Sequence, residues 1–286
     1  MEKYRLEGKT FVIDDYDKMP AFSSFLPGLA GVKGIPMWTF YTNRGQGMNS
    51  FGIDNKGNAI MEFNSANTAF ENTIVKGFRT FLKIDGEYYE PFFKYEKEAK
   101  RQIRMNKNSF KIIETNEKYG IEVTVNYFIL PNESIGALIR QVSVKNISDK
   151  AKDVEIIDGL PKIITYGISN GEFKEMSNLF KSWAYIKNID NKVPYYTLRA
   201  STKDSAEVSD VEGGYYYLTI KDGKLQDVIY DVDTVFGYDL SLMTPVRFID
   251  GGVDNVLAKE QCFANKVPCG FTPFKETIGA GETFSF

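Results

Sequence analysis

The residues best suited to ligand chemistry stand close together in the stretch Trp38–Phe51, which reads WTFYTNRGQGMNSF. It combines flat aromatic rings with amide and guanidinium groups, and its glycines allow a tight, exposed backbone. Sugar recognition needs this mixture, because rings stack on the C–H face of a sugar while polar groups bind neighbouring hydroxyls. The candidate substrate-binding residues are Trp38, Tyr41, Arg44, Gln46 and Asn49. The alternative interpretation is an ordinary polar hairpin loop beside a core tryptophan.

Carboxylates also cluster near the start of the chain, where Asp14, Asp15 and Asp17 precede Met19-Pro20. Two carboxylates that flank a glycosidic bond could cleave it by acid–base catalysis. The spacing fixes no such geometry, however, and aspartate is common in turns. We therefore predict a solvated loop here and assign no catalytic residue.

The absence of histidine removes whole classes of chemistry. It excludes Ser-His-Asp and Cys-His catalysis, histidine-ligated zinc and the histidine-dependent reaction of aldose mutarotases. The cysteines, Cys262 and Cys269, are too few for a disulfide framework or a metal site. We predict that both are buried free thiols, and that the chain holds neither metal nor cofactor.

Charge and hydropathy limit the classes of binding partner and the cellular location that we expect. The net charge is −3 and the sequence pI is about 5.4, so no basic surface is indicated and nucleic acid is excluded as the expected partner. No apolar run is long enough to span a membrane, and residues 1–10 lack the apolar region of a signal peptide. We therefore predict a cytoplasmic protein.

Alternation of apolar and polar residues dominates the chain and predicts an all-β protein. The clearest case is Gly120–Leu130, where every second residue from Ile121 to Ile129 is apolar, as in a half-buried strand. Asp85-Gly86 and Asp222-Gly223 each stand between strand-like runs and predict tight hairpins. Further strands are predicted over Phe11–Ile13, Met37–Tyr41, Ala59–Phe63, Ser109–Glu114, Leu138–Asn146, Val154–Ile157, Tyr195–Ala200, Val246–Ile249 and Thr283–Phe286.

One segment has helical periodicity instead. From Glu172 to Lys187 the apolar residues recur at helical spacing, and Ser169 with Glu172 forms a capping-box pattern. We predict one helix over Glu172–Lys187 that lies across a sheet face or edge. No repeat or low-complexity linker divides the chain, so residues 1–286 are predicted to form one large domain of two antiparallel sheets packed face to face.

Four stretches of the sequence carry a resemblance to a known family. Phe11–Phe63 resembles the N-terminus of the 1,2-β-oligoglucan phosphorylases, which are inverting glycoside phosphorylases related to cellobiose phosphorylase. Similar stretches follow at Asp158–Trp183, Val235–Leu242 and Asn265–Phe274, which read DGLPKIITYGISNGEFKEMSNLFKSW, VFGYDLSL and NKVPCGFTPF. The resemblance therefore runs over nearly the full length.

The resemblance implies a β-supersandwich of the galactose-mutarotase-like type with one or two short helices. In the parent enzyme it would precede a helical linker, an (α/α)6 barrel and a C-terminal β piece. Such enzymes cleave a β-glucosidic bond with inorganic phosphate as co-substrate and release glucose 1-phosphate with inversion. Because their catalytic aspartate and phosphate-binding residues lie in the barrel, this chain is expected to be truncated from a longer enzyme and inactive alone.

The resemblance also implies partners and residue roles. The sandwich would recognise a β-linked gluco-oligosaccharide, pack on its own barrel and help to form a homodimer. Arg44 would clamp hydroxyls or phosphate oxygens bidentately. Gln46 and Asn49 would exchange hydrogen bonds with sugar hydroxyls, and Trp38 or Tyr41 would stack on the ring.

Two other functions remain open. The chain could be a free-standing carbohydrate-binding module or a regulatory lectin-like protein, or a small sugar epimerase or mutarotase on the same sandwich. The absence of histidine argues against the epimerase or mutarotase. The terminal run Thr283–Phe286, which begins a strand and then stops, argues for a domain of a longer enzyme rather than a free-standing module.

Overall fold

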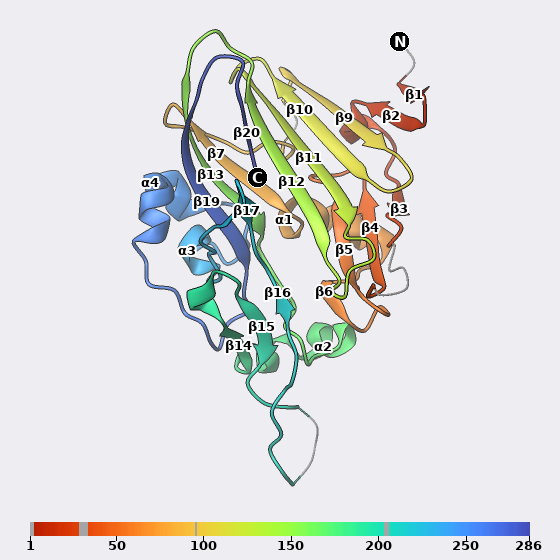
Figure 1. Ribbon diagram of the computed structural model, residues 1–286, viewed down its shortest axis with the longest axis vertical. Helices are drawn as coiled ribbons and strands as arrows, with labels where there is room; N and C mark the ends of the chain where they lie inside the picture. The colour runs from red at the N-terminus through yellow and green to blue at the C-terminus, as the bar shows by residue number, and fades with distance from the viewer. Residues whose placement is uncertain (1–2, 29–33, 95, 203–205) are drawn as a thin grey trace.

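The computed structural model describes residues 3–28, 34–94, 96–202 and 206–286 (Figure 1). It is an all-β architecture in which every pair of neighbouring strands within a sheet is antiparallel. The largest sheet has seven strands and consists, in spatial order, of β1 (Tyr4–Glu7), β2 (Thr10–Asp14), β9 (Ala99–Met105), β10 (Phe110–Asn116), β11 (Ile121–Ile129), β12 (Leu138–Asn146) and β20 (Thr283–Ser285).

Two four-stranded sheets face this large sheet. One is ordered β19 (Gly270–Ile278), β13 (Lys152–Leu160), β7 (Arg79–Ile84) and β8 (Glu87–Tyr89). The other is ordered β3 (Ser23–Phe25), β4 (Met37–Thr42), β5 (Met48–Ile53) and β6 (Ala59–Met61). The predicted face-to-face packing of antiparallel sheets is therefore confirmed, with the second layer divided into two sheets.

Smaller elements complete the chain. They are a three-stranded sheet of β14 (Ala184–Lys187), β15 (Tyr195–Leu198) and β16 (Tyr215–Tyr216), and a hairpin of β17 (Ile220–Lys221) and β18 (Lys224–Leu225). The α-helices are α1 (Ala66–Lys76), α2 (Asn170–Lys181), α3 (Asp233–Phe236) and α4 (Val246–Leu257), and the 3-10 turns are η1 (Tyr16–Lys18) and η2 (Ile189–Asn191). Among the described residues, no helix is long and apolar enough to cross a membrane.

The main core lies between the large sheet and the two smaller ones. Alternate residues of β11 are buried along its whole length, which is the predicted period-2 pattern. Val123 of β11 belongs to one continuous apolar cluster with Phe51 of β5, Leu82 of β7 and Ile156 of β13. Both four-stranded sheets are therefore fixed to the large sheet by the same core.

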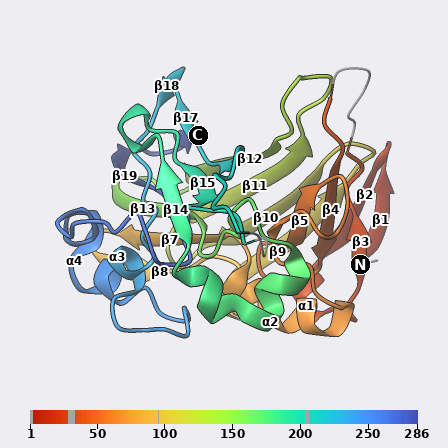
Figure 2. The same cartoon turned by 90° about the horizontal axis from the view of Figure 1, so that it is seen from below.

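A second core lies on the opposite face of the sheet formed by β19, β13, β7 and β8. Phe81 of β7 and Phe271 of β19 pack there against Phe236 of α3 and Phe248 of α4. Figure 2 shows α3 and α4 together on this side of the molecule, away from α1 and α2. Both residue faces of β7 are thus buried, and so are those of the first part of β19, whereas Lys275 and Thr277 further along β19 are exposed.

The predicted helix is confirmed at its start and shorter at its end. Ser169 accepts a hydrogen bond from the Glu172 backbone N–H, and the Glu172 carboxylate accepts one from the Ser169 N–H, which completes the capping box. The helix ends at Lys181, and Ala184–Lys187 forms β14 instead. The backbone N–H and C=O groups of β14 pair with those of β15. In a longer helix they would instead have bonded to other residues of the same helix.

The strand predicted over Val246–Ile249 is wrong, because these residues begin α4. A run of four residues with mixed polarity fits one helical turn as well as a short strand. Burial of Phe248, Val253 and Val256 on one side of α4 decides the outcome. The two Asp-Gly hairpins are confirmed, with positive φ at Asp85 and at the other turn residues.

Candidate functional site

The predicted sugar-binding loop is the tight connection between β4 and β5. The Gly47 N–H donates to the Arg44 carbonyl at 3.0 Å, and the Thr42 N–H donates to the Gly47 carbonyl at 2.8 Å. Gly47 has φ of +84°, and a Cβ atom there would lie 2.3 Å from the ring of Phe110. The loop is therefore folded tightly against the core, and both of these features require glycine.

The aromatic candidates of this segment point to opposite sides of the sheet. Tyr41 is buried, and its ring stacks on Phe110 with centroids 4.3 Å apart, so it has no free face for a sugar. Trp38 is half-buried on the other side, where its indole N–H donates to the Asn55 carbonyl at 2.9 Å. Of the two predicted stacking residues, only Trp38 retains exposed surface.

The Arg44 side chain binds backbone carbonyls and does not extend freely into solvent. Its guanidinium donates to the Asn43 carbonyl at 2.7 Å and to the Met19 carbonyl at 3.2 Å. Asn43, which is fully buried, donates to the Tyr16 and Pro20 carbonyls at 3.0 Å each. These contacts fasten the loop to η1 and the segment after it, and they hold the Arg44 guanidinium against backbone carbonyls.

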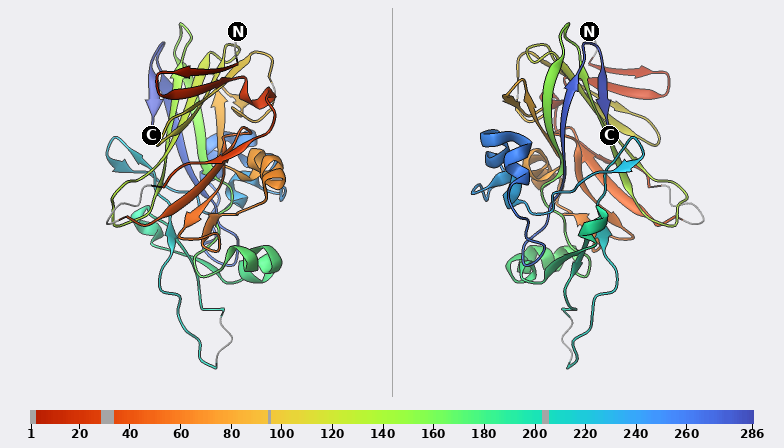
Figure 3. Two further views of the ribbon diagram at one scale, coloured as in Figure 1. Left: turned by 90° about the vertical axis from the view of Figure 1, so that its right-hand side faces the viewer. Right: turned by 60° about the vertical axis from the view of Figure 1, so that its left-hand side comes forward.

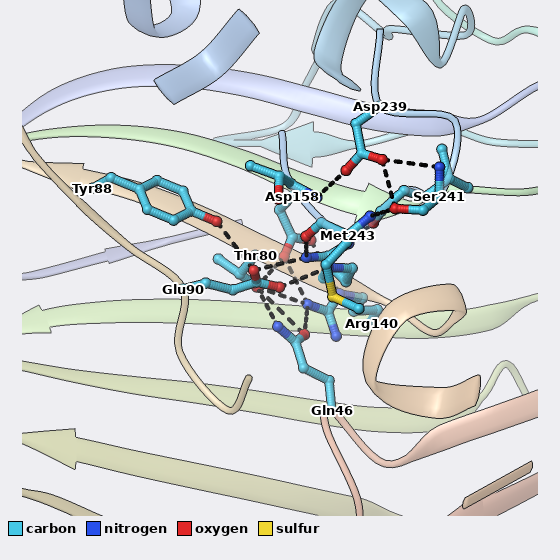
Figure 4. A network of polar contacts seen from close by, with 12 residues as sticks. Gln46, Thr80, Tyr88, Glu90, Arg140, Asp158, Asp239, Ser241 and Met243 are labelled. Atoms are coloured by element: carbon cyan, nitrogen blue, oxygen red, sulfur yellow. Dashed lines mark hydrogen bonds and ion pairs between the residues drawn. The ribbon is translucent and has the colours of Figure 1, made fainter. Parts of the chain in front are cut away.

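Gln46 points inward and belongs to a buried polar network (Figure 4). Its amide donates to the Thr80 hydroxyl at 3.0 Å, and its carbonyl oxygen accepts from Arg140. Arg140 donates to both oxygens of Asp158, at 3.0 and 2.7 Å, and Thr80 donates to the same carboxylate at 2.6 Å. The network joins β12 of the large sheet to β7 and β13, so we assign Gln46 a structural role.

A second buried ion pair joins Arg79 to Glu90, and Figure 4 shows Glu90 beside this network. Arg79 donates to the two oxygens of Glu90 at 2.6 and 2.8 Å, and Tyr88 donates to Glu90 at 3.1 Å. Arg79 also donates to the carbonyls of Leu242 and Met243. The buried carboxylates Glu90 and Asp158 in Figure 4 are thus each paired with a guanidinium.

Replacing Gln46 with leucine is expected to lower the free energy of unfolding by about 1–3 kcal/mol, because Thr80 and Arg140 lose a buried partner. Urea unfolding followed by circular dichroism measures the change. Gln226→Leu is the matched control, because the one hydrogen bond that the structure shows for its side chain goes to the Lys224 carbonyl. Equal stability of the Gln46 variant and the wild type would contradict the structural role.

Asn49 alone of the predicted polar residues lines a hollow. This polar hollow is a partly open depression between α1, β5, β6 and the segment that follows β13, with a cavity volume of about 20 Å³. Its polar lining consists of Asn49, Glu62, Asn64, Asn72, Thr73, Lys76 and Lys162. Figure 3 shows α1 beside the sheet that contains β4 and β5. Amide, carboxylate and ammonium groups together can donate to and accept from several hydroxyls.

Aromatic residues stand near the lining residues of the polar hollow in the chain. Phe63 stands in the chain between two lining residues and contacts Trp38 edge to face, with ring centroids 5.8 Å apart. Its ring also lies 5.7 Å from that of Phe40. Phe25 pairs with Phe40 across strands β3 and β4, and its side chain is 62% exposed. The contact between Phe63 and Trp38 thus places apolar ring surface next in the chain to the hydroxyl-binding residues Glu62 and Asn64.

Lys162 is the most enclosed cation of the polar hollow. Its ammonium lies 4.4 Å from the ring centroid of Phe173 and 3.6 Å from the Glu62 carboxylate. Burial lowers the pKa of Lys162, the Glu62 carboxylate opposes this shift, and the neighbouring charge of Lys76 adds to it. The hollow has a single lining carboxylate, whereas cleavage of a glycosidic bond by paired acids needs two.

The sequence patterns did not predict six of the hollow's polar residues: Glu62, Asn64, Asn72, Thr73, Lys76 and Lys162. Five of them precede or belong to α1, which was not predicted because its apolar residues form no strong helical stripe. Lys162 offered a signal, since it is a lone cation in the apolar run from Leu160 to Ile164. A charged side chain inside such a run needs a polar site or a partner.

The acidic cluster near the N-terminus does not converge on one site. Asp14 accepts from Arg5 and Gln102, whereas Asp17 accepts from Arg101 at 2.9 Å. Asp15 lies near Lys3 and Lys18. The predicted solvated loop is thus a set of separate ion pairs.

The prediction of two buried thiols holds only for Cys269, because Cys262 is exposed. The Cys262 backbone N–H donates to the buried Asp231 carboxylate at 3.0 Å, which holds this segment at the surface. In the part of the chain that the structure describes, no group of three metal-ligating side chains comes together.

Stability is expected to fall at high pH because buried tyrosines hold their protons. Burial, with the nearby Asp158 carboxylate, raises the pKa of Tyr217 to about 12, and burial also raises the pKa of Tyr16, Tyr127 and Tyr196. Unfolded tyrosine ionises near pH 10, so the unfolded state binds fewer protons above that pH. The free energy of unfolding should decrease from about pH 10 towards pH 12.

Urea unfolding at a series of pH values measures this effect. Tyr217→Phe, which removes one ionisable group, is expected to show a shallower decrease over the same range. A pH dependence identical to that of the wild type would contradict the assignment of a raised pKa to Tyr217.

The fold and the site together define an antiparallel β-sandwich protein with a small polar hollow beside half-exposed aromatic rings. Comparison of the sequence with protein-family models and with curated proteins gives no match.

Proposed function

We propose that this chain is a non-catalytic carbohydrate-recognition domain, namely the N-terminal β-supersandwich of an inverting β-glucan phosphorylase. The polar hollow is the single observation on which the proposal depends. Its amides and the Glu62 carboxylate suit sugar hydroxyls, and Phe63 and Trp38 offer apolar surface beside them. Asn49 and Trp38 keep their predicted roles in this proposal, whereas Tyr41, Arg44 and Gln46 position the backbone.

The lack of paired acids supports a binding role over a catalytic one. The polar hollow is lined by one carboxylate, and the buried carboxylates Glu90 and Asp158 are both paired with arginine. In the proposed parent enzyme, the helical barrel would supply the catalytic aspartate and bind the phosphate co-substrate. Contact with that barrel, homodimer formation and a cytoplasmic location are parts of the same proposal.

Binding of β-linked gluco-oligosaccharides to the 286-residue chain tests the proposal. Trisaccharides with β-1,2 and β-1,4 linkages are titrated against the protein, and binding is followed by calorimetry and by tryptophan fluorescence. We expect Glu62→Gln and Phe63→Ala each to weaken binding about tenfold, or about 1.4 kcal/mol. Asn178→Ala, an exposed amide on α2, is the control that should bind normally.

Catalysis is tested separately. Incubation of the chain with β-glucans and inorganic phosphate is expected to release no glucose 1-phosphate. Turnover by the purified chain would overturn the non-catalytic assignment. Failure of every gluco-oligosaccharide to bind, in a chain shown to be folded, would overturn the recognition role.

A further inference from the structure

Two side chains of α1 offer free hydrogen-bond donors to the polar hollow. Asn72 and Lys76 are four residues apart and therefore lie on the same face of the helix, and both line the hollow. Within the described part of the chain, neither side chain has a hydrogen-bond or ion-pair partner, and Lys76 is exposed to solvent. These donors are thus available to a ligand that brings acceptors.

Lys162 provides a third donor from another part of the chain. It comes from the segment after β13, and Phe173 of α2 packs against its ammonium at 4.4 Å. Its contact with Glu62, at 3.6 Å, is longer than a good charge-assisted hydrogen bond. Lys162 therefore keeps hydrogen-bonding capacity for a ligand even though it is near a carboxylate.

The charges that line the polar hollow do not cancel. Lys76 and Lys162 contribute two positive charges and Glu62 one negative charge, so the balance is +1. The like charges of the two lysines repel each other in a partly desolvated space, where the interaction is stronger than in water. A bound anion would relieve this repulsion and accept hydrogen bonds from both ammonium groups.

We propose that the polar hollow contains a subsite for a phosphate group, held between Lys76 and Lys162 with the Asn72 amide as an additional donor. The phosphate group belongs either to inorganic phosphate or to a sugar phosphate. This inference deepens the proposed function and rests on it in one respect, namely that the same hollow receives the sugar. A neutral sugar would use the amides and Glu62, whereas the two lysines select for an oxyanion.

Titration with inorganic phosphate, glucose 1-phosphate and glucose tests the subsite in the full 286-residue chain. Binding is followed by nuclear magnetic resonance of the lysine side chains and by calorimetry at two salt concentrations. We expect both phosphates to shift the Lys162 resonance and to raise its pKa, because anion binding favours the charged ammonium. Tighter binding of glucose 1-phosphate than of inorganic phosphate would identify the sugar phosphate as the ligand, and the reverse order would identify free phosphate.

Variants locate the subsite. Lys76→Met removes an exposed side chain, so the fold should be retained while phosphate binding weakens at least tenfold. Lys162→Met is expected to have the same effect on phosphate, and Lys162→Arg should recover part of the affinity. Lys224→Met, which removes an exposed lysine from β18, is the control and should bind phosphate normally.

Three results would overturn the phosphate subsite. The first is an absence of phosphate binding while neutral gluco-oligosaccharides still bind, which would leave the proposed function intact. The second is an equal loss of affinity in the Lys76 and Lys224 variants, which would show non-specific attraction to surface charge. The third is an absence of binding for phosphates and neutral saccharides alike, which would refute the proposed function as well.

Discussion

Replacing Arg79 with methionine is expected to lower the free energy of unfolding by about 3–5 kcal/mol. The Arg79 side chain is 1% exposed and donates to both oxygens of Glu90, which is itself buried. Its removal leaves the Glu90 carboxylate in a low-dielectric interior without a counter-ion. The carbonyls of Leu242 and Met243 lose the same donor, so the loop before α4 should loosen as well.

Urea unfolding of the variant measures the loss, and hydrogen exchange measures the loosening of the loop. The control is Lys100→Met, which removes an exposed ion pair with Glu117 and should change stability by less than about 1 kcal/mol. A double variant, Arg79→Met with Glu90→Leu, should be more stable than the sum of the two single changes predicts, because no charge is then left unpaired. A cost for Arg79→Met as small as that of Lys100→Met would refute the importance of the buried pair.

Replacing Phe81 with alanine is expected to cost about 3–5 kcal/mol. The side chain of Phe81 is fully buried, and its ring contacts those of Phe236, Phe248 and Phe271 at centroid distances of 5.8, 6.4 and 5.9 Å. The alanine variant leaves a cavity between β7 and the helices α3 and α4, and neighbouring groups fill such a space only in part. Protection of α3 and α4 against hydrogen exchange should therefore fall more than protection of the large sheet.

The matched control for Phe81 is Leu240→Ala. Leu240 is 87% exposed in the loop between α3 and α4, so its truncation should change stability by no more than about 0.5 kcal/mol. The contrary result is that Phe81→Ala lowers the hydrogen-exchange protection of all strands equally and leaves that of α3 and α4 unchanged. That result would refute the view that the second core attaches α3 and α4 to the sheet.

Local sequence patterns predicted much of the fold. The alternation in Gly120–Leu130 led directly to β11, because one face of an antiparallel strand packs on the core while the other meets a more polar environment. Asp85-Gly86 predicted its hairpin because a two-residue turn needs residues that tolerate positive φ. Ser169 and Glu172 predicted a helix start through hydrogen bonds that span only three residues.

The candidate site was predicted only in part. Gln46, Asn49 and Arg44 are all polar and all near glycine, so composition alone treats them alike. Gln46 faces Arg140, ninety-four residues away, whereas Asn49 faces the polar hollow beside α1. Which polar side chain is buried in a network and which one reaches a hollow depends on partners that are distant in the sequence.

The sequence by itself determined the all-β class, the hairpin turns, the capped helix and the exclusion of histidine chemistry, because each of these depends on residue type or on neighbours a few positions away. Only the tertiary structure decided that Val246–Ile249 is helical, that Tyr41 is a core residue and that Lys162 joins α1 in a common hollow. The physical reason is that burial and charge pairing are settled between segments far apart in the chain, as in the contact of Arg79 with Met243.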